Sequence, residues 1–201
     1  MDIKKFSLFP TLVLYFPQFI SSKECNKIFK LLKTKKVDTH PAVIKGKSSH
    51  HSSINTNILS ETSLDLNTPL QEYSNQSRIK IANKITYSWF NIQDKGSILK
   101  EHLHPSSILS GSLFIEVGKN ASKLYFHNPN PFVSYTAKTE PSNIYTYDWY
   151  CLHPKKGDLI IFPSWLKHGS NQDNNFYKNR TVISFNTFYK KKPDTRAGLF
   201  Y

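Results

Sequence analysis

The chain has 201 residues and a formal net charge of +13, from 27 basic and 14 acidic side chains. About 38% of the residues are hydrophobic and 14% are aromatic, so residues 1–201 suit a single domain with a core of its own. Two cysteines, seven glycines and eleven prolines exclude a disulfide framework, a collagen-like rod and a Gly/Pro-rich low-complexity chain.

Residues 1–88 are expected to form a mostly helical support for the rest of the chain. Residues 8–16 are rich in β-forming side chains and predict a first strand. Serines at the start of residues 21–36 suit an N-cap, and the apolar stripe that follows has helical spacing. The polar stretch 37–66 predicts a loop, and a second helix is expected over residues 68–88.

From residue 89 onward, short aromatic or β-branched runs alternate with turn signals, which predicts a series of strands. These strands are expected at residues 89–92, 97–104, 109–117, 123–127, 143–150, 158–162 and 180–189. Helices followed by many short strands indicate an α+β protein, with an antiparallel sandwich or barrel over residues 89–189 and flanking N-terminal helices. Residues 190–201 are left as a C-terminal tail.

Two of the eight histidines, His102 and His104, have a spacing that suits a shared metal ion. On a strand, residues i and i+2 point to the same face, so both imidazoles would lie on one side and Leu103 on the other. Pro105 ends the hydrogen bonding of the strand beside the pair. Such a pair alone is weak evidence for a metal, and histidines in the core or facing solvent are the alternative.

A third histidine and an arginine follow downstream. His168 ends a segment that consists of a turn, a buried strand and a loop, and twelve residues later Arg180 opens another apolar strand. Alternation places Val182, Ser184 and Asn186 on the same face as Arg180. Only three arginines stand against 24 lysines, so an arginine here indicates a planar fork that pairs with a carboxylate. A surface arginine is the alternative.

Four segments together resemble, in order and spacing, a family of 2-oxoglutarate- and Fe(II)-dependent oxygenases. That family occurs in bacteria and phages and is related to the prolyl hydroxylases. The segments lie between about residues 86 and 189 and read HLHPSSILSGSLFIEV, LYFHNPNP, GDLIIFPSWLKHGSN and RTVISFN. The resemblance implies a double-stranded β-helix (jelly-roll) core. It also implies a dioxygenase that uses O₂ to convert 2-oxoglutarate to succinate and CO₂ while hydroxylating a substrate.

The same resemblance implies roles for individual residues. His102, His104 and His168 would be the catalytic residues that hold Fe(II). Arg180 would match the arginine that pairs with the C5 carboxylate of 2-oxoglutarate. The residues expected to bind this co-substrate are Arg180, Ser184, Asn186 and Asn91.

The sequence departs from the family pattern at two positions that bear on the site. His104 stands where the usual triad has a carboxylate. Three neutral imidazoles would leave Fe(II) at a formal charge of +2, which attracts the dianion 2-oxoglutarate more strongly. Phe114 stands where the family usually has a tyrosine, so it cannot supply a hydroxyl to the C5 carboxylate.

Two alternatives to the oxygenase stay open. One is a cupin-type enzyme with a three-histidine metal site and no 2-oxoglutarate. The other is a jelly-roll module without catalysis, such as a binding or virion protein. Metal content and 2-oxoglutarate binding distinguish the three.

The expected partner is an unidentified small molecule or peptide. The diffuse positive charge leaves nucleic acid open without favouring it, because lysines on solvated faces explain most of the excess. No membrane partner is expected, since the N-terminal apolar run is far shorter than the ~20 residues that cross a bilayer. Two thiols that read as reduced favour a cytoplasmic protein, and the sequence leaves the oligomeric state open.

Overall fold

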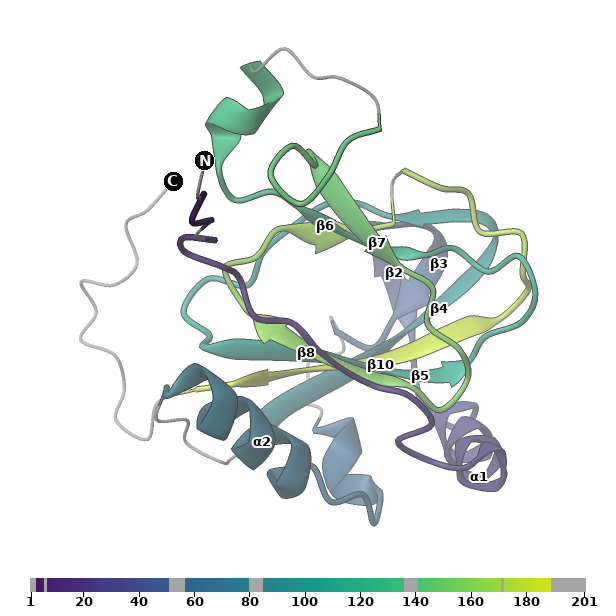
Figure 1. Ribbon diagram of the computed structural model, residues 1–201. Coiled ribbons are helices and arrows are strands. Elements are labelled where there is room, and N and C mark those ends of the chain that lie inside the picture. The colour runs from purple at the N-terminus through teal and green to yellow at the C-terminus, as the bar shows by residue number, and fades with distance from the viewer. Residues whose placement is uncertain are drawn as a thin grey trace.

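Two antiparallel sheets, one large and one small, form the body of the protein (Figure 1). The computed structural model describes residues 3–5, 7–50, 57–79, 85–135, 141–170 and 172–188. The large sheet contains β1 (Leu14–Phe16), β2 (Asp38–His40), β3 (Val43–Ser48), β4 (Ile85–Leu99), β5 (Leu109–Glu116), β8 (Leu159–Pro163) and β10 (Arg180–Thr187). The small sheet contains β6 (Leu124–His127), β7 (Trp149–Leu152) and β9 (His168–Gly169).

The two sheets are the layers of a jelly roll. In the large sheet the spatial order is β1-β8-β5-β10-β4-β3-β2, and in the small sheet it is β7-β6-β9. An isolated antiparallel bridge between His102 and His168 adds a further segment beside β9. Four segments of the small layer thus face β4, β10, β5 and β8, which is the eight-stranded jelly-roll arrangement. The predicted α+β fold with a double-stranded β-helix core is confirmed.

Helix α1 (Ser22–Leu32) follows the predicted start closely. The Ser21 hydroxyl caps it by accepting a hydrogen bond from the Glu24 N–H at 3.2 Å. Its apolar face, made of Cys25, Ile28 and Leu32, is buried. Figure 1 shows α1 and helix α2 (Asn67–Ser77) on the side of the large sheet that faces away from the small sheet.

The predicted second helix over residues 68–88 is wrong in its C-terminal half. Helix α2 ends at Ser77, because Arg78 adopts a left-handed conformation with φ of +60°. The chain from Ile85 onward is strand β4, which pairs with β10 from Ile85 to Gln93. β-Branched and aromatic residues in this stretch suit a strand, and pairing with β10 outweighs the weak helical spacing.

The loop predicted over residues 37–66 is also wrong, because it contains β2, β3 and the short 3-10 helix η1 (Ile58–Glu61). Strand β3 pairs with β4, and several of its side chains are exposed and polar, so the sequence shows little alternation. The strand expected at 89–92 and the first three residues of that expected at 97–104 belong to β4, which ends at Leu99, so the strand expected to carry His102 and His104 is wrong there and only an isolated bridge forms at His102. Strand β1 covers only the end of the expected run 8–16, and β7 only the end of 143–150.

Strand β9 has no counterpart among the expected elements. A second 3-10 helix, η2 (Pro131–Tyr135), precedes β7. The predicted tail at residues 190–201 lies outside the described residues. No helix in the described part of the chain is long and apolar enough to cross a membrane.

Side chains of the large sheet alternate between two environments. One face packs against the helices in the main hydrophobic core, with Phe90, Leu113, Ile183 and Phe185 among its buried members. The other face points into the jelly roll, where a second cluster contains Phe114, Phe126, Ile160, Phe162, Leu166 and Val182. The expected alternation along β10 is confirmed, because Arg180, Val182 and Ser184 all line a pocket inside the jelly roll.

Candidate functional site

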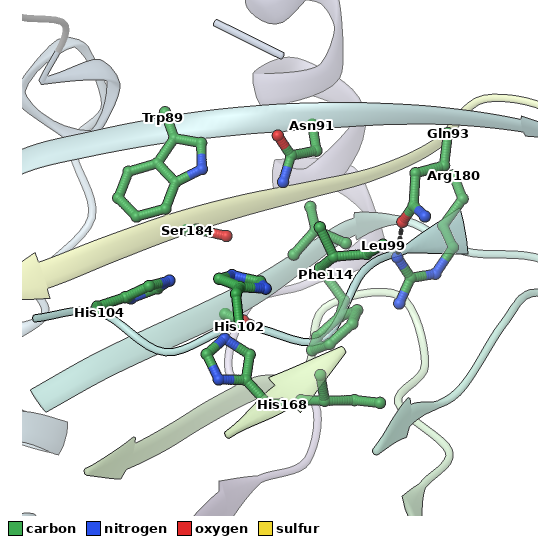
Figure 2. Close-up of a pocket in the computed structure, with 13 residues that line it drawn as sticks. Trp89, Asn91, Gln93, Leu99, His102, His104, Phe114, His168, Arg180 and Ser184 are labelled. Carbon is green, nitrogen blue, oxygen red and sulfur yellow. Dashed lines mark hydrogen bonds between the residues drawn. The ribbon is translucent and has the colours of Figure 1, made fainter. Parts of the chain in front are cut away.

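Three imidazoles from distant parts of the chain meet at one end of this pocket (Figure 2). His102 and His168 face each other across the isolated bridge, where each N–H donates to the carbonyl oxygen of the other at 2.9 Å. His104 lies two residues further on, and its N–H donates to the Ser164 carbonyl at 2.9 Å. One potential ligand atom from each ring lies within 4.8 Å of the other two.

The second nitrogen of each ring is fixed by an oxygen acceptor. His102 Nδ1 lies 2.8 Å from the Lys100 carbonyl, and His168 Nδ1 lies 2.8 Å from the Leu166 carbonyl. His104 Nδ1 lies 2.8 Å from the Asn186 side-chain oxygen Oδ1. A carbonyl oxygen accepts only, so in all three neutral rings Nδ1 carries the proton and Nε2 keeps its lone pair. The three rings are therefore set to coordinate one cation through Nε2.

Burial keeps these rings neutral. It lowers the pKa of His104 to about 4, with a smaller contribution from the neighbouring His102. It also lowers the pKa of His102, and it lowers that of His168 well below the ordinary value of 6.5. Near neutral pH no proton therefore competes for the Nε2 lone pairs.

A glycine lets the two ligand-bearing segments approach this closely. A Cβ at Gly169 would lie 2.9 Å from the backbone of Glu101 and from the Leu99 carbonyl oxygen, a distance that Cβ atoms do not adopt. Beside the bridge, Lys167 Nζ lies 2.8 Å from Glu101 Oε1, and His127 Nε2 lies 2.9 Å from Glu101 Oε2. The positions of His102 and His168 are thus held by backbone bonds and by an ion pair between their neighbours.

The other end of the pocket holds a buried guanidinium (Figure 2). Arg180 is 4% exposed, and its Nη1 donates to Oε1 of Gln93, which is 1% exposed. The guanidinium carbon lies 5.4 Å from the centroid of the Phe114 ring. Burial lowers the pKa of Arg180 to about 10. No acidic side chain lines this pocket or pairs with Arg180 in the described part of the chain.

Several buried polar atoms around the guanidinium lack a hydrogen-bond partner among the described residues. They are Arg180 Nε, Gln93 Nε2 and Asn91 Oδ1. A buried polar group without a partner is unfavourable, and such groups are normally satisfied. The cluster is therefore built to receive a polar molecule, and the lone guanidinium indicates an anion.

The structure brings the predicted site residues together with one difference. His102, His104, His168, Arg180, Ser184 and Asn91 all line the same pocket. Asn186 lies behind His104 instead, where its side chain orients the ring and borders a neighbouring cleft. Gln93 was not among the predicted residues. It follows Trp89 and Asn91 at alternate positions on β4, but the strand was expected to end at residue 92, so the alternation was not continued.

The neighbouring cleft has a volume of about 390 Å³ and shares a wall with the pocket. Trp89, Asn91, His102 and His104 border both. The rest of the cleft has a mixed lining that includes three rings: His40 on β2, His50 just after β3 and Tyr87 on β4. The ring centroids of Trp89 and His104 are 5.5 Å apart, so this wall continues directly into the three-histidine cluster.

Loss of the acceptor behind His104 should weaken metal binding. Asn186→Ala removes one partner of Nδ1, while the Ser110 hydroxyl remains 2.7 Å from the same nitrogen. We expect metal affinity to fall about 10-fold in Asn186→Ala and towards 100-fold when Ser110→Ala is added. Competition between the protein and a chelator for Ni(II) measures this, with Asn75→Ala on helix α2 as the matched control. Unchanged affinity in the double variant would contradict the orienting role.

Comparisons with known proteins agree with this geometry. Residues 87–186 match the sequence model of a family described as "Putative 2OG-Fe(II) oxygenase". A search of curated proteins finds no match. Among solved structures the chain is similar to a prolyl-4-hydroxylase from Pseudomonas putida, with a TM-score of 0.61 and 10% identity over 89% of this chain and 94% of that one.

Two further structures are similar to a comparable degree. HygX from Streptomyces hygroscopicus, with nickel and 2-oxoglutarate bound, has a TM-score of 0.62 and 11% identity over 90% of this chain and 84% of that one. A prolyl hydroxylase from Trichoplax adhaerens, in complex with a hypoxia inducible factor peptide, has a TM-score of 0.58 and 11% identity over 90% and 84%. At these identities the likeness establishes the shared fold.

Proposed function

We propose roles for individual residues from the premise that this chain belongs to the 2OG-Fe(II) oxygenase family, whose model it matches over residues 87–186. The protein is thus a 2-oxoglutarate- and Fe(II)-dependent oxygenase, an oxidoreductase. His102, His104 and His168 would hold the iron. Arg180 would bind the distal carboxylate of 2-oxoglutarate. Asn91 and Ser184 would contact the co-substrate from the pocket wall between the three histidines and Arg180.

The observation that carries the metal assignment is the convergence of three imidazoles within 4.8 Å. Each ring donates through Nδ1 and keeps Nε2 for a cation. Imidazole nitrogens are suitable ligands for Fe(II), so the donor set fits the metal that the family requires. Because none of the three is anionic, the protein leaves the full charge of the cation to be balanced by the co-substrate.

The side chains that line the pocket between the histidines and Arg180 have the chemistry to bind a dicarboxylate. It has a guanidinium at one end, three imidazoles that would hold a cation at the other, no acidic side chain among the described residues of its lining, and unpartnered polar atoms beside the guanidinium. Leu99, Phe114 and Val182 supply apolar walls along its length. When bound, Fe(II) and 2-oxoglutarate supply an oxidant made from O₂ with release of succinate and CO₂, and the residues of this chain position both.

We place the substrate in the cleft of about 390 Å³ on the other side of Trp89. Its apolar and aromatic lining suits a small molecule or a segment of peptide, bound with the reacting carbon towards the shared wall at His104. The Pseudomonas and Trichoplax proteins named above are prolyl hydroxylases, and the latter is seen with a peptide. We also propose a cytoplasmic location, which the two free thiols Cys25 and Cys151 support.

The proposal is tested by binding and by turnover. Protein purified without chelator and loaded with Fe(II) should convert 2-oxoglutarate to succinate in air, even without the true substrate. Anaerobic calorimetry should show 2-oxoglutarate binding to the metal-loaded protein. Absence of both would overturn the assignment. Metal binding without 2-oxoglutarate would favour the cupin-type enzyme, and absence of metal would favour a non-catalytic jelly-roll protein.

A further inference from the structure

Gln93 occupies an unusual position beside the buried guanidinium. It is paired in register with Arg180 across strands β4 and β10, and its side chain is fully buried in the pocket wall. Its Oε1 accepts a hydrogen bond from Arg180 Nη1 (Figure 2). A guanidinium only donates, so the amide must present its oxygen to Arg180. The orientation of the amide is therefore fixed by chemistry.

This orientation leaves a buried donor without an acceptor in the pocket wall. Gln93 Nε2 carries two N–H groups and has no hydrogen-bond partner among the described residues. Arg180 Nε is a second such donor in the same place. Phe114, which lies against the guanidinium, offers only its ring. Two buried donors with no acceptor, one of them cationic, mark the place of an acceptor-only anionic group.

We propose that Gln93 is a co-substrate-binding residue with two separable roles: Oε1 holds Arg180 in place, and Nε2 donates to the distal carboxylate of 2-oxoglutarate. The inference rests on the proposed function, which supplies the dicarboxylate. Arg180 alone would attract any anion. The added neutral donor, Gln93 Nε2, fixes the distance and direction from the metal end at which the distal carboxylate of 2-oxoglutarate binds. Gln93 therefore contributes to the choice of a five-carbon diacid over a 2-oxo acid that lacks this group.

Two substitutions of Gln93 test the roles. Gln93→Met removes both the acceptor and the donor in a side chain of similar size. Gln93→Glu keeps an acceptor for Arg180 but replaces the donor with a negative charge that faces the co-substrate. A negative charge beside Arg180 weakens binding of a dianion in either role, so the roles are separated by Gln93→Met in the Arg180→Met background, where a residue that only held Arg180 would cost no further affinity. Because we assign Nε2 to the carboxylate, we expect a further loss of 2-oxoglutarate affinity in that double variant, and we expect Gln93→Glu to bind worst of the two Gln93 variants.

The experiment is anaerobic calorimetry of Ni(II)-loaded protein with 2-oxoglutarate. We expect the dissociation constant to rise about 10-fold in Gln93→Met and at least about 100-fold in Gln93→Glu, as for lost hydrogen bonds to a charged group. Pyruvate, which has the 2-oxo acid but no distal carboxylate, should compete for the metal site equally well in all three proteins. Gln71→Glu on helix α2 controls for the added charge, and nickel content and circular dichroism report an intact site and fold.

Three outcomes would overturn the assignment. Unchanged 2-oxoglutarate affinity in Gln93→Met would remove Gln93 from the site. No further loss from Gln93→Met in the Arg180→Met background would reduce it to a support for Arg180. A parallel loss of pyruvate binding would show that the change acts through the metal end. Failure of the wild type itself to bind 2-oxoglutarate would instead overturn the proposed function, and the role of Gln93 with it.

Discussion

His168→Ala will purify without stoichiometric iron and will form no succinate from 2-oxoglutarate. His168 is 4% exposed, it faces His102 across two backbone hydrogen bonds, and its Nδ1 is fixed by the Leu166 carbonyl. Among the described residues, no carboxylate lines the pocket to take its place as a ligand. Loss of a partner behind a ligand typically costs 10- to 100-fold in metal affinity, so loss of the ligand itself should exceed about 100-fold.

Metal analysis and a chelator competition with Ni(II) measure this loss. His153→Ala is the matched control, because His153 is an exposed histidine outside the pocket. The His168→Ala protein should keep its fold, since the backbone hydrogen bonds between residues 102 and 168 do not depend on the side chain. Stoichiometric metal in a folded His168→Ala protein would show that the cation is held elsewhere.

Arg180→Met should weaken 2-oxoglutarate binding while leaving the protein at least as stable without ligand. The guanidinium is buried with no acidic partner in the described part of the chain, and burial lowers its pKa to about 10 because the charged form is poorly solvated there. An uncharged side chain of similar length removes that unfavourable charge. The bound carboxylate, however, loses a charged donor worth about 1.5–3 kcal/mol, or roughly 10- to 150-fold in affinity.

Thermal unfolding with and without 2-oxoglutarate separates the two effects. A ligand at 100 times its dissociation constant stabilises the wild type by about 2.7 kcal/mol. The same concentration should stabilise Arg180→Met by little, although the Tm of the ligand-free variant is not lowered. Arg78→Met, at the exposed end of helix α2, controls for the lost charge. A full ligand-induced shift in Arg180→Met would exclude Arg180 as the carboxylate-binding residue.

The fold was predictable because its core strands carry strong local patterns. The buried run from Leu159 to Phe162 and the alternation from Arg180 to Asn186 both appear in the structure as expected. The weaker elements were not predictable. Strand β3 has little apolar periodicity and exists because its backbone pairs with β4. Strand β9 has two residues and depends on partners that are distant in sequence.

The candidate site, like the fold, was only partly predictable from the sequence. The spacing of His102 and His104 suited a shared metal ion, the resemblance of four segments to the oxygenase family added His168, and the three imidazoles do converge. Their roles as ligands stay a prediction. The pairing of Gln93 with Arg180 was hidden, because it depends on the register of two strands separated by about 90 positions in the chain. Asn186 shares the face of Arg180 as expected, but the length of β10 places it at the other end of the pocket, behind His104.

The segment that carries His102 and His104 leaves β4 of the large sheet and joins the small layer, where His102 bridges His168 at the start of β9. A single ion shared by the three rings would link this segment to β9, and an ion that binds only the folded state stabilises it against unfolding. The thermal stability of this protein and its resistance to proteolysis should therefore increase with the fraction of protein that holds iron. The same ion would then determine both the lifetime of the folded enzyme and its activity.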